Sequence, residues 1–375
     1  IINDNYKFDP EGVYFSVGFD ESDPQSSYIE YIDSLPLSAG PQVFGLHENA
    51  NIACTLTETF SMFDTILSLE ARDTSGGGGS QEDAVGNVSA DIHKKLAEKG
   101  AFDIEAIGMQ YPVIYEESMN TVLVQECIRY NRLIQEMLRT LPELNKALKG
   151  LVVMSTELED MSKTIAVNQV PTSWEDKAYP SMKPLASWVD DLIERLEFIG
   201  QWVENGIPNV FWVSGFYFPQ AFLTGAQQNF ARKNTFPIDT VNFNFHMLDV
   251  DDWEDIDEKP EDGVYIRGLF LEGARWDAEA HSLNDSIPKQ LYTPMPVIHL
   301  HPAQFREDPK SGVYRCPVYK VLSRRGTLST TGHSTNFIMW IEVPSNSGDI
   351  VNNIGKVDQE KWIKAGVAAF CSLKF

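Results

Sequence analysis

The spacing of apolar residues changes once along this 375-residue protein, and that change limits its fold more than any other feature. Between about 119 and 203, apolar side chains recur every three or four residues, which is the period of one face of a helix. After Gly206 the period falls to two, and in TVNFNFHML (240–248) apolar side chains alternate with Asn and His, as in a half-buried strand. The protein is therefore predicted to be α+β, with a helical N-terminal half followed by an antiparallel β-rich C-terminal module. That module is expected to be a small barrel or a curled sheet.

Three apolar stripes define the long helices expected in the first half. The first, 119–141, is followed by Pro142, which is expected to break or kink it. The second covers 144–165, and the third opens near Pro184 and stops by Gly206. Shorter helices are expected at 28–37, 55–71, 88–99 and 219–233. The stripe residues expected to carry the packing are Met119, Tyr130, Ile134, Leu151, Trp188, Leu192 and Ile199.

The second half is divided into short strands by turn residues. Besides 240–248, strands are expected at 263–273, 296–300, 314–321 and 335–343. Pro317 has no N–H for a ladder, so its strand is expected at an edge or a bulge.

A glycine-rich segment, SGGGGS at 75–80, lies between two of the shorter helices. It resembles an engineered linker or a natural loop, and in either case 73–87 is expected to be flexible.

The charge balance bears on partners. The 30 basic residues face 54 acidic ones, a net charge of −24, which argues against binding nucleic acid or anionic membranes. No apolar run approaches the ~18 residues that a membrane span needs. The four cysteines lie far apart and are expected to be reduced thiols. The sequence begins with Ile and shows no leader, so it is expected to be a piece of something longer.

One segment invites a catalytic interpretation, RGTLSTTGHSTNF at 325–337. A small hydrolase would use Ser329 or Ser334 as nucleophile with His333 as base. A third group to orient the histidine and a strained elbow such as G-x-S-x-G are both missing. Neighbouring side chains on a strand also point to opposite faces, so a hairpin is favoured over a catalytic loop.

Motifs for nucleotides and metals are absent or incomplete. The sequence has neither common phosphate-binding loop, and HENAN (47–51) lacks the second histidine of a zinc-protease helix. His299 and His301 stand two apart on a predicted strand, which makes them weak metal candidates without further ligands. The acidic run 249–262 lacks the glycine and final glutamate of a calcium loop, and is interpreted as a solvated loop or a contact to a basic partner. No catalytic residue, cofactor or metal site is predicted.

Beyond these patterns, the protein resembles the carboxy-terminal end of dynein heavy chains over nearly its whole length. GLFLEGARWD (268–277) and LSTTGHSTNF (328–337) resemble the axonemal branch of that family. The other segments that carry the resemblance are VFGLHENANI (43–52), YPVIYEESMNTVLVQE (111–126), LKGLVVM (148–154), SWEDKAYPSMKPLASWVDDLIERLEFIGQW (173–202), FWVSGFYFPQAFLTGAQQNFARKNTFPID (211–239), CPVYKV (316–321) and WIKAGVAAFC (362–371).

The resemblance implies a division into three parts. Residues 1–50 would be the end of the small helical lid subdomain of the sixth AAA+ module in a ring of six. Residues 51–206 and 207–375 would be the helical and β-rich parts of the C-terminal domain, which lies across a face of that ring. ATP hydrolysis in this family belongs to earlier modules and microtubule binding to the tip of a stalk.

The resemblance also implies a function: a non-catalytic structural and regulatory module of an axonemal heavy chain, within an ATP-driven, minus-end-directed motor. The implied partners are the other AAA+ modules and, through the parent protein, intermediate chains, light chains and the axonemal complex. Nucleic acid, membrane, direct microtubule contact and a cofactor are not expected. The implied location is the cytoplasmic side, in the axoneme of a cilium or flagellum. Inner or outer arm, and activation or restraint of the motor, stay open.

Overall fold

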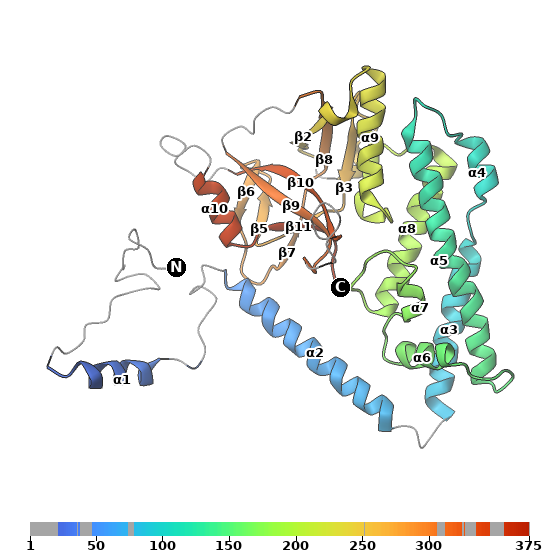
Figure 1. The fold of residues 1–375 in the computed structure, drawn as a ribbon, viewed down its shortest axis with the longest axis horizontal. Coiled ribbons are helices and arrows are strands. Elements are labelled where there is room, and N and C mark those ends of the chain that lie inside the picture. The colour runs from blue at the N-terminus through green and yellow to red at the C-terminus, as the bar shows by residue number, and fades with distance from the viewer. Residues whose placement is uncertain are drawn as a thin grey trace.

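The computed structural model describes residues 22–35, 37, 47–73, 79–250, 252–305, 312–324, 326, 335–345 and 356–374. Helices come first and strands follow, which confirms the predicted α+β order. In Figure 1 the helices α3–α8 form one side of the molecule and the strands the other, with α9 between them. Helix α2 runs diagonally from the strand side toward α3.

The longest of the described helices is α5, with 31 residues. None of the helices described combines the length and apolarity needed to cross a bilayer. Their bounds are α1 Pro24–Ser34, α2 Asn49–Asp73, α3 Gly79–Lys99, α4 Ile104–Gln110, α5 Ser118–Leu148, α6 Thr156–Ala166, α7 Thr172–Glu175, α8 Leu185–Asn205, α9 Pro219–Lys233 and α10 Lys356–Lys364.

Helix α5 corrects two expectations. It continues through Pro142 to Leu148 without a break. The side chains of Leu141 and Leu144, on either side of the proline, are both fully buried, and this packing offsets the hydrogen bond that proline removes. The predicted helix 144–165 is therefore the end of α5 plus a separate α6.

The end of α5 explains why one predicted packing residue is not packed. Gly150 adopts a left-handed φ of +69°, and the N–H of Leu151 donates to the Lys146 carbonyl at 2.9 Å, which closes the helix. Leu151 therefore lies beyond the helix, and 72% of its surface is exposed. Its expected place on a buried stripe was wrong.

The helical and β-rich halves share one hydrophobic core. Helix α5 packs against α3, α6, α8 and α9, so it lies at the centre of the helical half. The core then crosses into the β-rich half through a set of buried aromatic side chains in mutual contact. These are Trp202, Phe211, Phe216 and Phe222.

Eleven strands are described, in three sheets. A four-stranded sheet has the order β1-β3-β8-β2, a five-stranded sheet the order β10-β9-β11-β4-β7, and β5 pairs with β6. The pairs β1–β3 and β9–β11 are parallel and the others antiparallel, so the sheets are mixed, and the described strands close no barrel. The bounds are β1 Val210–Trp212, β2 Asn242–Met247, β3 Val264–Arg267, β4 Phe270–Glu272, β5 Ala274–Asp277, β6 Ser282–Asp285, β7 Tyr292–Pro294, β8 Ile298–Ala303, β9 Val313–Val321, β10 Phe337–Pro344 and β11 Ala368–Ser372.

Pro317 lies on β9, which has β10 on one side and β11 on the other, so the edge position was wrong. The register of β10 shifts between Phe337 and Met339, close to Pro317. The parallel ladder with β11 begins only at Val318, so the missing N–H falls just before that ladder.

Candidate functional site at the junction of the two halves

The residues that the sequence offered for catalysis, Ser329, His333 and Ser334, lie outside the described residues. His299 and His301 do share a face of β8, with ring centroids 5.3 Å apart. The ring of His246 on β2 lies 5.9 Å from His299.

This histidine cluster is not arranged as a metal site. The Nε2 atom of His299 is 2.8 Å from the carbonyl oxygen of Asp262, and burial lowers the pKa of this histidine. Among the described residues, no group of three or more His, Cys, Asp or Glu side chains is arranged so that it could hold a metal ion.

Six of the seven predicted packing residues are buried in the shared core; the exception is Leu151. Trp188 of α8 is packed between other aromatic side chains. Its ring stacks on Trp174 and on Tyr179, with centroids 6.2 Å away in both cases. The buried residues are Met119, Tyr130, Ile134, Trp188, Leu192 and Ile199.

A buried ion pair lies beside this aromatic stack, and the sequence analysis missed it. Asp191 and Arg195, one turn apart on α8, are 2.7 Å apart with 4% of each side chain exposed. Lys183 approaches the same carboxylate at 2.9 Å, and the Arg195 guanidinium lies 3.8 Å from the Tyr179 ring centroid. Burial by itself would raise the pKa of Asp191, but Arg195 and Lys183 outweigh it and hold that pKa below its ordinary value.

A second buried charge fixes the segment that leads from the helical half into α9. Glu126 of α5 is fully buried and accepts the backbone N–H groups of Tyr217 and Phe218. Arg129 pairs with it at 2.9 Å. Burial raises the pKa of this carboxyl above its ordinary value. The signal that could have found it is a glutamate on the apolar stripe of a long helix, where a charge needs buried partners.

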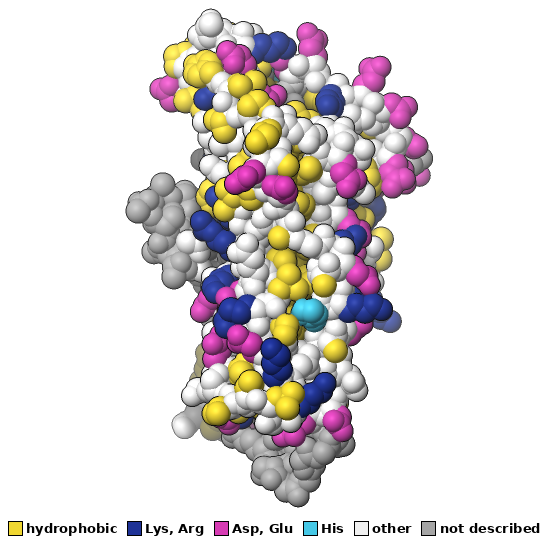
Figure 2. Space-filling model, turned by 90° about the vertical axis from the view of Figure 1, so that its right-hand side faces the viewer, with side chains coloured by type: hydrophobic (Ala, Val, Ile, Leu, Met, Phe, Trp, Pro, Cys, Tyr) yellow, Lys and Arg dark blue, Asp and Glu magenta, His cyan; other side chains and the backbone are white. Residues whose placement is uncertain are grey.

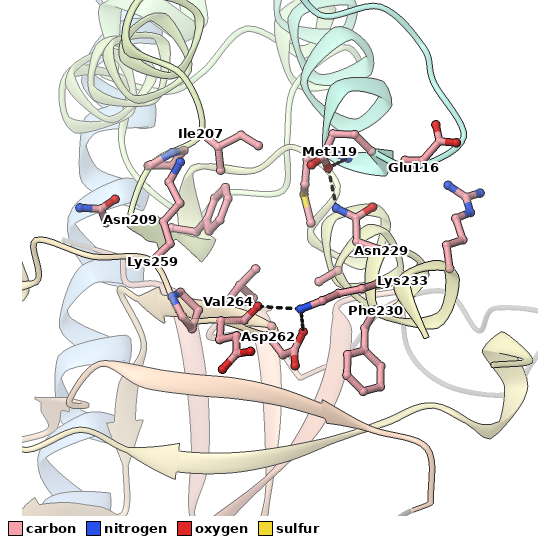
Figure 3. A pocket seen from close by; sticks show the side chains of 18 of the residues that line it. Glu116, Met119, Ile207, Asn209, Asn229, Phe230, Lys233, Lys259, Asp262 and Val264 are labelled. Atoms are coloured by element: carbon pink, nitrogen blue, oxygen red, sulfur yellow. Dashed lines mark hydrogen bonds and ion pairs between the residues drawn. The ribbon is translucent and has the colours of Figure 1, made fainter. Parts of the chain in front are cut away.

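The pocket in Figure 3 lies where the start of α5, helix α9 and the loop 259–263 meet, and has a volume of about 590 Å³. Its polar side chains are engaged with one another across these segments. Lys233 of α9 pairs with Asp262 at 2.6 Å, and Asn229 donates to Glu117 at 2.5 Å. These contacts tie the helical half to the first sheet of the β-rich half.

These contacts hold the segments around the pocket together. The described residues that line the pocket include no histidine and no cysteine. Elsewhere, burial raises the pKa of the Cys127 thiol and of the Cys371 thiol to about 12, so both are protonated at neutral pH and unreactive.

Two exposed apolar runs mark the ends of α5. Figure 2 shows hydrophobic side chains gathered near the upper and lower ends of the helical face. The run before α5, which we call the upper run, consists of Val113, Ile114 and Tyr115, with 44–73% of each residue exposed. The run after α5, the lower run, consists of Leu151, Val152, Val153 and Met154, with 37–90% exposed.

Comparison with known proteins identifies the family. Residues 56–371 match the family model that describes the C-terminal domain of dynein heavy chains. Dynein axonemal heavy chain 1 of Rattus norvegicus is 49% identical over 375 residues, which is all of the present sequence and 8% of that protein. The human dynein axonemal heavy chains 3 and 12 are 46% and 45% identical, each over 99% of the present sequence and over 8% and 11% of their own length. The protein described here thus spans about a tenth of the curated relatives it matches, and it belongs to the family of C-terminal domains of dynein heavy chains.

Proposed function

We propose that this protein is a non-catalytic structural and regulatory module of an axonemal dynein heavy chain. It packs across the AAA+ ring of an ATP-driven, minus-end-directed motor that bends cilia and flagella. Its neighbours are the other AAA+ modules of the same heavy chain, and through the parent protein it joins intermediate chains, light chains and the axonemal complex. The names of the relatives, all axonemal heavy chains, support this assignment.

The proposed division into parts follows the same assignment. Residues 1–50 form the end of the lid subdomain of the sixth AAA+ module. Residues 51–206 and 207–375 form the helical and β-rich parts of the C-terminal domain. Two sets of contacts cross from one part to the other: Glu126 accepts the backbone N–H groups of Tyr217 and Phe218, and Asn229 donates to Glu117. They support the view that the two parts move as one body.

The observation that carries the proposal is the pair of exposed apolar runs at the two ends of α5. Several neighbouring apolar side chains are seldom exposed together on the surface of a folded protein. Where they are, the patch commonly marks a contact with another protein surface. Helix α5 has 31 residues, and at ~1.5 Å per residue it holds the two runs roughly 45 Å apart. A stiff element with a contact at each end suits a module that links distant neighbours.

Such a link couples its neighbours energetically. If the two runs contact different parts of the ring, a shift of one part strains the contact at the other end. The two nucleotide-dependent states of the motor then differ in the stability of these contacts, which is the requirement for allosteric coupling.

The test uses a full-length motor that includes this module. Val153→Asp and, separately, Val113→Asp place a charge in each exposed run. We expect each change to alter ATPase rate and microtubule gliding velocity by about fivefold, because loss of a coupling contact costs roughly 1 kcal/mol. Either direction of change supports the proposal.

The matched control is Ile238→Asp, because Ile238 is also exposed, at 41%, but lies in the β-rich half. This variant is expected to leave both rates unchanged. If the motors with Val153→Asp and Val113→Asp behave like the unaltered motor, the two runs do not contact the ring and the proposal fails.

A further inference from the structure

One pocket of this acidic protein is lined mainly by basic side chains. It has a volume of about 790 Å³ and lies between α5, the segment 176–180, the segment 217–218 and β9. Five basic side chains line it against two acidic ones, although the full sequence has 54 acidic and 30 basic residues. The basic residues are Arg129, Arg132, Arg139, Lys177 and Lys320, and the acidic residues are Glu136 and Asp176.

The pattern on α5 explains how three of these cations come together. Arg129, Arg132 and Arg139 stand at spacings of three and seven, so they share one face of the helix. That face turns away from the apolar stripe of α5 and toward the pocket.

Three of the five cations already have carboxylate partners. Arg129 pairs with the buried Glu126 at 2.9 Å. Arg139 and Lys177 both pair with Glu136, at 2.5 Å and 2.6 Å. The pair between Lys177 and Glu136 joins the segment 176–180 to α5 along the wall of the pocket.

The other two cations, Arg132 and Lys320, have no ion pair with any carboxylate among the residues whose positions are described. The Lys320 amine instead lies 5.3 Å from the ring centroid of Phe218, and the Arg129 guanidinium lies 5.4 Å from the same ring. Burial lowers the pKa of Lys320, so its charge is held at a cost that a bound anion would offset. Among the described residues, neither cation is neutralised by a carboxylate, although the sequence has 54 acidic residues.

We propose that this pocket binds a compact anion with two or more adjacent phosphate groups. Arginine guanidinium groups match phosphate oxygens in geometry, and several cations on separate segments favour one small anion of high charge. The pocket volume lies in the range of small-molecule sites. The inference does not depend on the function proposed above, because it concerns a different surface and a different ligand.

The anion has two possible sources, a free polyphosphate or a phosphorylated segment of a protein. Isothermal titration of the 375-residue protein with sodium tripolyphosphate, at fixed ionic strength, measures the first. Titration with a peptide carrying two neighbouring phosphoserines measures the second. Tighter binding of one probe identifies the source, and saturable binding of either supports the site.

The site is tested with Arg132→Gln and Lys320→Gln, each expected to weaken tripolyphosphate or phosphopeptide binding at least tenfold. Arg132 is exposed, so its variant is expected to fold normally, and thermal unfolding checks both variants. The matched control is Lys163→Gln on α6, an exposed cation outside the pocket, which is expected to change nothing.

Three results would overturn the proposal. The first is the absence of saturable binding of both probes. The second is equal weakening by Lys163→Gln, which would indicate general attraction of anions. The third is tighter binding of an unphosphorylated glutamate-rich peptide than of either probe, which would make the pocket a site for acidic protein segments.

Discussion

Replacing Trp188 with Ala is expected to lower the free energy of unfolding of this protein by about 3–5 kcal/mol, the range for truncating a large buried aromatic side chain. Only 1% of Trp188 is exposed, and its ring lies between Trp174 and Tyr179. The two stacked rings would relax only partially into the cavity left behind. Adding Leu192→Ala, one turn along α8 and fully buried, is expected to leave much of the helical half unfolded, since domains are stable by only about 5–15 kcal/mol.

Urea unfolding followed by far-ultraviolet circular dichroism measures this loss. Leu151→Ala is the control, because it removes the same kind of side chain from an exposed position and is expected to change stability by no more than about 0.5 kcal/mol. The two core changes are neighbours, so their effects are not expected to add. An unchanged unfolding midpoint in the double variant would show that α8 does not hold the helical half together.

Local chemistry explains which elements were predictable. Helix α8 begins directly after Pro184 and ends at Asn205, just before Gly206, whose φ of +87° is accessible to glycine at little cost. Helix α9 begins at Pro219, as predicted. The alternation in 240–248 likewise marked β2, because Phe243 on one face is buried and His246 on the other face is exposed. These signals lie within a few residues of the element they define.

Two features that depend on distant partners were not predicted, strand β11 and the continuation of α5 past Pro142. Strand β11 (Ala368–Ser372) is buried at every position and lies between β4 and β9, so it shows no alternation. Its parallel pairing with β9 joins segments about fifty residues apart in the sequence, and no local pattern reports that. Helix α5 likewise continues past Pro142 because of distant contacts. Leu141 and Leu144, on either side of the proline, are buried against other helices.

The junction was predictable only in part. The apolar stripes correctly placed Trp188 and Leu192 in a core. The backbone N–H groups that donate to Glu126, those of Tyr217 and Phe218, lie more than ninety residues away in the sequence. The clamp between Lys233 and Asp262 joins α9 to a loop in the β-rich half. A single sequence shows that a charge lies on an apolar face, but only the fold shows what neutralises it.

The second large effect on stability is expected from the buried ion pair between Asp191 and Arg195 on α8. Asp191→Asn keeps the size of the side chain but removes the charge that Arg195 and Lys183 share. Arg195, 4% exposed, is then left as a buried cation without a carboxylate, and the expected loss of stability at neutral pH is about 3–5 kcal/mol. Glu159→Gln is the control, because it breaks the exposed pair with Lys163, worth about 0–1 kcal/mol.

The pH dependence separates loss of charge from loss of shape. The pKa of Asp191 in the folded protein is lowered below its ordinary value of 3.8, so its stabilising contribution is complete above that value and is lost as the pH falls through the folded pKa. Glu126, whose pKa is raised, has the opposite dependence, but it is present in both proteins and cancels in their difference. The gap in unfolding free energy between the parent protein and Asp191→Asn should therefore be widest near neutral pH and close in acid, where the protonated aspartate and the asparagine are both neutral. A gap that stays constant from neutral pH to strong acid would mean that hydrogen-bond geometry, and not the charge of Asp191, holds Arg195 in the core.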